Sequence, residues 1–121
     1  MIVRVDGLKK VQGNIGAMIF NKADGFPDKA ENAFASKVVE VKNETPIIIF
    51  TNLPSGKYAV SLIHDVNSNS DLDKNFIGIP TEPFGFSGNK SIFAGLPKFE
   101  EAAIDLKSNH IESRIKLIEI F

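Results

Sequence analysis

The chain has 121 residues, a length that suits one domain with one hydrophobic core. Fourteen Lys and Arg residues against fifteen Asp and Glu residues give a formal net charge of −1, without the basic excess that binds nucleic acid or anionic lipid. The absence of cysteine excludes disulfides, thiolate metal sites and cysteine nucleophiles. No apolar run reaches the length of about 18 residues that crosses a bilayer. We therefore expect a single domain over residues 1–121 with no membrane span.

Short strand-like segments separated by turn residues follow one another from the N-terminus. The first, MIVRVDG, alternates apolar and charged residues and is typical of a strand, not of a signal peptide. The segments predicted as strands are residues 1–7, 14–25, 34–42, 45–53, 53–65, 99–106 and 111–121. The polar residues NET, between the third and fourth of them, are of the kind found in hairpins. This pattern predicts an all-β fold, a single antiparallel β-sandwich of about seven strands, immunoglobulin- or transthyretin-like.

Helix signals are scarce. Only residues 26–36 could form a turn or two of helix, with Pro27 near its start and Asp28 in its first turn. The alternative is a crossing loop that contains alanines. At the other end of the chain, Ile118 and Ile120 break the alternation of the last segment, which predicts a bulge or burial on both faces there.

Polar side chains with oxygen ligands follow the fifth segment at every second position. Hard cations such as Ca²⁺ bind six to eight oxygens from carboxylates, amides, backbone and water, and a loop that winds around the ion turns alternate side chains inward. The predicted metal ligands are Asp65, Asn67, Asn69, Asp71 and Asp73. The cofactor expected from this pattern is calcium, held by a loop over residues 64–76.

The pattern does not complete an EF-hand. Counted from Asp65, the sixth position is Ser70 instead of glycine, and the twelfth is Phe76 instead of glutamate. A second interpretation needs no ion, because Asn, Asp and Ser also favour loops in which they hydrogen-bond their own backbone. The loop therefore either holds a hard cation or caps itself.

A catalytic interpretation centres on His64. In it His64 serves as a base with help from Asp71, Asp73 or Glu82, in a small hydrolase or lyase. However, His64 is in phase with Tyr58, Val60 and Leu62, so it continues the predicted core face, where a structural role is more common. Adjacent residues of a strand point to opposite faces, which disfavours a dyad with Asp65. The sequence favours a non-catalytic protein and leaves the catalytic alternative open.

The same residues carry a family resemblance. The segments SGKYAVSLIHDVNSNSDLD, GIPTEPFGFSGN and PKFEEA match in order the motifs of bacterial domain of unknown function family 2141. This match spans residues 53–106, whereas the N-terminal half agrees only in its strand pattern. The positions carried over are His64, Asp65, Asn67, Asn69 and Asp73. Members often have Glu, Gly and Gly at the three positions where this chain has Val66, Ser68 and Ser70, which makes the tightest loop conformations more costly.

The resemblance implies an exported bacterial β-sandwich without a settled activity. We therefore expect a non-catalytic binding or structural module whose partner is an unknown protein or small-molecule ligand. The expected location is periplasmic or extracellular, with a leader that this sequence does not include. The alternative is a cytoplasmic protein. Association of the sandwich through its edge strands is a further hypothesis.

Overall fold

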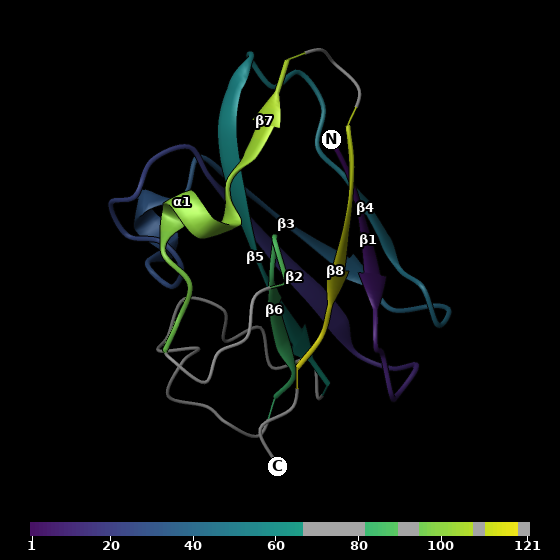
Figure 1. The fold of residues 1–121 in the computed structure, drawn as a ribbon. Coiled ribbons are helices and arrows are strands. Elements are labelled where there is room, and N and C mark those ends of the chain that lie inside the picture. Colours follow the sequence, from purple (N-terminus) through teal and green to yellow (C-terminus); the bar gives the residue numbers. More distant parts are fainter. Residues whose placement is uncertain (67–81, 90–94, 108–110, 119–121) are drawn as a thin grey trace.

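The strands form two sheets that face each other (Figure 1). The computed structural model describes residues 1–66, 82–89, 95–107 and 111–118. The first sheet has the order β4 (Ile47–Ile49), β1 (Ile2–Asp6) and β8 (Glu112–Lys116). The second has the order β3 (Ala35–Glu40), β2 (Asn14–Phe20), β5 (Gly56–Asp65) and β6 (Phe84–Phe86), and β7 (Ile104–Leu106) pairs with the start of β5. The all-β sandwich predicted from the sequence is confirmed.

The pairing differs from the prediction in two respects. Strands β1 and β8 run parallel, whereas the other named pairs are antiparallel. Strands β3 and β4 do not form the hairpin expected around NET, because they belong to different sheets. The connection between them therefore crosses from one layer of the sandwich to the other.

The core between the sheets follows the alternation of the sequence. Val3 and Val5 of β1 are fully buried against the second sheet, and so is Ile115 of β8. The second sheet contributes one face of β2 and β5 to this cluster, namely Ile15, Ala17, Ile19, Tyr58, Val60 and Leu62. Each large apolar side chain buried in this way stabilises the fold by about 1.5–3 kcal/mol.

The opposite face of the second sheet has a cover of its own. Residues 21–33 and the short helix α1 (Phe99–Ala102) carry aromatic side chains onto this face. The ring of Phe26 lies 5.4 Å from that of Phe20 and 6.2 Å from those of Phe86 and Phe99, in edge-to-face geometry. Strand β5 is therefore buried on both faces from Tyr58 to Asp65.

Two segments differ from their predicted secondary structure. Residues 99–106 were expected to form one strand, but they form helix α1 followed by β7. The prediction was wrong because Phe99 and Ala102 are apolar at helical spacing, and both contribute to the buried side of the turn. Between residues 26 and 36 only a single 3₁₀ turn forms, at Ala30–Asn32, within a crossing segment.

The two sheets are joined along one side of the sandwich. Phe84 and Ile118 exchange two backbone hydrogen bonds of 3.1 and 2.6 Å, which links β6 to the chain just beyond β8. The side-chain amide of Asn89 extends this link, because it donates to the Arg114 carbonyl and accepts from the Lys116 amide. On the other side, β3 and β4 are the outermost strands of their sheets among the residues that the structure describes. No helix in the described part of the chain is long and apolar enough to cross a membrane.

Replacing Ser87 tests the attachment of α1 to β5. The buried Ser87 hydroxyl accepts a 2.9 Å hydrogen bond from the Val60 amide and donates a 2.6 Å bond to the Ala102 carbonyl. Ser87→Ala leaves both buried backbone groups without this partner, so we expect a loss of about 1–3 kcal/mol in the free energy of unfolding, measured in urea. Ser55→Ala, at an exposed turn, is the control and should leave stability unchanged.

Candidate functional site

The candidate site lies where β5 ends and the loop to β6 begins. The ladder between β5 and β6 pairs Ile63 with Phe84, and the His64 amide then donates to the Pro83 carbonyl at 2.8 Å. Continuing this register places Asp65 opposite Glu82. These two acidic residues therefore flank the part of the sequence that contains the other predicted ligands. The predicted ligands Asn67, Asn69, Asp71 and Asp73, together with Phe76, lie outside the described residues.

Polar side chains form a row across the end of the second sheet. Asn14 of β2 is paired in register with Glu40 of β3 on one side and with Asp65 of β5 on the other. These residues share the sheet face that carries the Phe26 cluster, and Glu82 continues the row beyond β5. Asp65 is 3% exposed and Glu82 is 9% exposed. We call Glu40, Asn14, Asp65 and Glu82 the acidic row.

The side chains of Glu82 and Gln12 both form hydrogen bonds with the backbone of Val66, the residue after β5. The Glu82 Oε2 accepts a 2.9 Å hydrogen bond from the Val66 amide, which ties the residue after β5 to the segment before β6. The Gln12 Nε2 donates to the Val66 carbonyl at 3.3 Å. Both polar groups of the Val66 backbone are thus satisfied by side chains from other segments.

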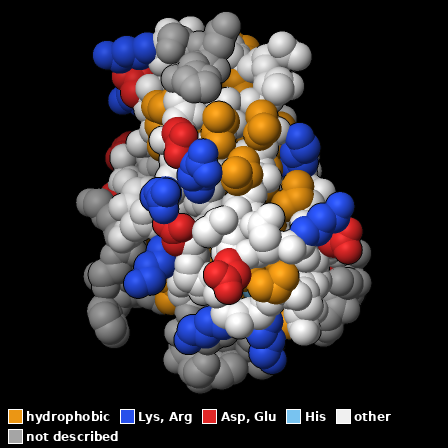
Figure 2. All heavy atoms as spheres, turned by 90° about the vertical axis from the view of Figure 1, so that its right-hand side faces the viewer, with side chains coloured by type: hydrophobic (Ala, Val, Ile, Leu, Met, Phe, Trp, Pro, Cys, Tyr) orange, Lys and Arg blue, Asp and Glu red, His pale blue; other side chains and the backbone are white. Residues whose placement is uncertain are grey.

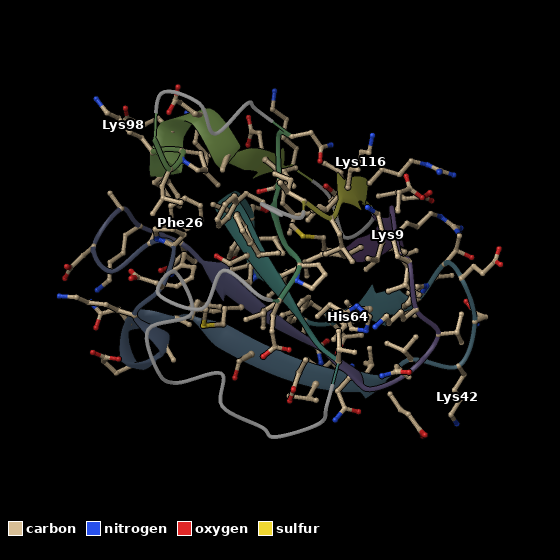
Figure 3. The ribbon with its side chains drawn as sticks, turned by 90° about the horizontal axis from the view of Figure 1, so that it is seen from below. Lys9, Phe26, Lys42, His64, Lys98 and Lys116 are labelled. Carbon is tan, nitrogen blue, oxygen red and sulfur yellow. The ribbon has the colours of Figure 1, made fainter. Side chains whose placement is uncertain are left out.

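His64 is a buried structural residue in this arrangement. It is 1% exposed, and its Nε2 lies 2.8 Å from the Gln12 carbonyl. Because a carbonyl oxygen only accepts, Nε2 carries the proton of this bond. Figure 3 views this end of the sandwich and shows His64 beneath the strand ends, whereas Lys42 lies at the periphery. The catalytic interpretation requires His64 to face solvent in a cleft, and this geometry does not provide that access.

Gly13 brings the turn before β2 directly onto the end of β5. Its φ is +72°, and a Cβ at this position would lie 2.1 Å from the Asp65 carbonyl oxygen and 2.6 Å from that of Val66. Only glycine fits such a close approach. The turn that carries Gln12 is therefore held against the base of the loop.

The described residues alone do not complete a metal site. Within residues 1–66, 82–89, 95–107 and 111–118, no group of three or more His, Asp and Glu side chains is placed to hold a metal ion. Asp65 is the one predicted ligand among them, and the structure adds Glu82 next to it in register. Sequence reasoning considered Glu82 only as an assistant to His64, and it did not single out Gln12. The pairing of β5 with β6 brings Glu82 next to Asp65, and the turn before β2 brings Gln12 to the Val66 carbonyl.

Comparison with known proteins gives the family of the chain. The family described as "Uncharacterized protein conserved in bacteria (DUF2141)" matches residues 3–114. The chain belongs to this family. No curated protein and no solved structure matches the chain. The resemblance seen in residues 53–106 is thus confirmed, and the family match also includes β1 to β4, where only the strand pattern agreed.

Replacing Gly13 tests how closely the turn must approach β5. Gly13→Ala forces a Cβ into the Asp65 and Val66 carbonyls, so we expect a loss of roughly 3 kcal/mol or more in the free energy of unfolding, measured in urea. Gly95→Ala is the matched control, because Gly95 also has a positive φ, +108°, but has nothing within 4 Å of a Cβ. Equal losses in the two variants would show that φ strain, not the contact, sets the cost.

Proposed function

We propose that this chain is a non-catalytic binding or structural module of an exported bacterial protein, periplasmic or extracellular, in which residues 64–76 form a loop stabilised by Ca²⁺. The observation that carries the calcium part is the position of Asp65 and Glu82. Both carboxylates are buried, and the continued register of β5 with β6 places them opposite each other, on either side of the sequence segment that contains the other predicted ligands.

A bound cation relieves an electrostatic cost that the acidic row creates. Side chains directly opposite each other on adjacent strands have Cβ atoms about 4.5–5.5 Å apart, and like charges there destabilise a sheet. The Val66 amide occupies one lone pair of Glu82, and an ionised carboxylate has about four acceptor positions, so Glu82 has further acceptor capacity. A divalent ion between the strand ends would offset the two charges of Asp65 and Glu82 and take its remaining ligands from Asn67, Asn69, Asp71 and Asp73.

Calcium fits this ligand set better than magnesium. The proposed ligands are carboxylate and amide oxygens, most of them close together in the sequence, which suits the six to eight ligands and variable geometry of Ca²⁺. Magnesium demands near-ideal octahedral geometry and retains several waters, so a cage made entirely of protein oxygens is unusual for it. We therefore expect selectivity for Ca²⁺ over Mg²⁺.

The non-catalytic part of the proposal is supported by the surroundings of His64. The histidine that a hydrolase or lyase would need as a base is buried and bonded to the Gln12 carbonyl. Glu82 is engaged by the Val66 amide instead of by His64. We also propose that the sandwich is immunoglobulin- or transthyretin-like, as its two facing sheets and the crossover from β3 to β4 suggest.

Thermal unfolding in the presence of calcium tests the proposal. Excess Ca²⁺ should raise the melting temperature by several degrees, because an ion that binds only the folded state at about 100 times its dissociation constant adds about 2.7 kcal/mol of stability. Asp65→Asn and Glu82→Gln should each remove most of this rise. The measurement is a circular-dichroism melt with CaCl₂, MgCl₂ or EDTA.

Asp105→Asn is the control, because Asp105 is an exposed acid on β7, and it should leave the calcium response intact. A melting temperature that is identical in calcium and in EDTA would refute the ion site. The polar residues of the loop would then be explained by hydrogen bonds to their own backbone, without an ion.

A further inference from the structure

The sandwich has an open seam along the side where β3 and β4 end their sheets. In the described part of the chain no β-pairing joins these two strands, although they are the outermost strands on the same side. The contact between them is a 2.7 Å hydrogen bond from the Lys37 Nζ to the Ile49 carbonyl. The Lys37 side chain therefore bridges the two strands at a place where, in a closed barrel, a ladder of backbone hydrogen bonds would join them.

Backbone polar groups of both strands face this seam. Met1 and Phe50 exchange backbone hydrogen bonds, and the Pro46 carbonyl accepts from Val5, so the even-numbered residues of this segment face β1. By alternation, the amides and carbonyls of Ile47 and Ile49 point away from β1. On β3, the Val41 amide donates to Gly13, so Ser36 and Val38 turn their backbone groups outward in the same way. These groups have the spacing that an added strand requires.

Exposed apolar side chains flank the seam. Ile47 and Ile49 on β4 are 43% and 47% exposed, and Val38 on β3 is 55% exposed. Phe34, just before β3, is 45% exposed and packs against the ring of Tyr58. Figure 2 shows the adjoining side of the molecule, where hydrophobic side chains gather among charged ones. Ile47 and Ile49 are thus exposed on the outer face of the first sheet, and Val38 is exposed on the outer face of the second sheet.

The size and charge of the seam identify its occupant. A three-residue edge with two half-exposed isoleucines is small against the roughly 800 Å² per partner that a stable dimer buries, so it suits one extended segment better than a second globular copy. A strand that pairs with β4 takes over the Ile49 carbonyl and displaces Lys37. A carboxylate on the incoming strand would give the displaced ammonium, which is exposed, a charge-assisted hydrogen bond.

We propose that the seam between β3 and β4 binds an extended apolar peptide segment by strand addition to β4, with an acidic side chain of that segment facing Lys37. The bound strand would pair with the outward backbone groups of Ile47 and Ile49, and its outward side chains would cover these two isoleucines. In the free protein Lys37 shields the edge, which is a common protection against unspecific pairing. This inference rests on the binding role proposed above and is independent of the calcium loop.

A pair of synthetic peptides tests the proposal. The probe is a blocked, dye-labelled peptide of sequence VTVEVTV, and its partner VTVKVTV differs only in the central charge. Fluorescence anisotropy with the whole chain should show binding of the glutamate peptide, about tenfold tighter than the lysine peptide, the difference expected for one charge-assisted hydrogen bond. Lys37→Glu should reverse this preference. Ile49→Pro, which removes an outward amide and leaves the ladder to β1 intact, should weaken both by about tenfold or more.

Three results would overturn the proposal. The first is no binding of either peptide, and the second is a preference that Lys37→Glu does not change. The third is concentration-dependent dimerisation in light scattering that Lys37→Glu or Ile49→Pro abolishes, because a second copy would then occupy the seam. Val11→Ser, an exposed apolar residue outside the seam, is the control and should bind as the parent does. Peptide binding by a chain that does not respond to calcium would support the seam and refute the ion site alone.

Discussion

Strand β5 is the element on which the rest of the sandwich depends, because it is buried on both faces and paired along both edges. From Tyr58 to Asp65 every residue is buried. One face packs against the first sheet, and the other packs against the aromatic cluster around Phe26. Its edges carry β2 on one side and β6 and β7 on the other. A strand held in this way has one permitted register, since a slip by one residue would exchange its two faces. The positions of His64 and Asp65 follow from that register.

The register of β5 also explains which parts of the fold could be predicted. Alternation in residues 53–65 correctly placed Tyr58, Val60 and Leu62 in the core between the sheets, because that face is apolar and the period of a strand is two. The sequence did not reveal the second buried face, because its cover comes from Phe26 and Phe99, which are distant in the chain. Strand β6 was missed because FGF is short and contains a glycine, and its pairing with Leu62 is a tertiary contact. Similarly, no local signal distinguishes a hairpin from a connection between layers, so β3 and β4 were wrongly joined.

The candidate site was predictable only in part for the same reason. The spacing of oxygen-bearing side chains after β5 is a local pattern, and it indicated Asp65 as the start of a cation loop. That Glu82 lies opposite Asp65, and that Gln12 and Gly13 close the base of the loop, depends on which strands are neighbours. The same holds for His64, because its hydrogen-bond partner, the Gln12 carbonyl, lies in a turn 52 residues away in the sequence. Side-chain chemistry can be read from a sequence, but the partner of each side chain is decided by the sheet order.

The parallel pair of β1 and β8 has a consequence for how the protein forms. Arg4 and Glu112 are ion-paired across this ladder although 108 residues separate them. Contacts between segments so distant in the chain are slow to form, because a long loop must close before any of them is made. The first sheet therefore lacks one of its two strand pairings until β8 is available, and that edge of β1 stays unpaired until then. Completion of the first sheet is thus a late event that depends on both ends of the chain.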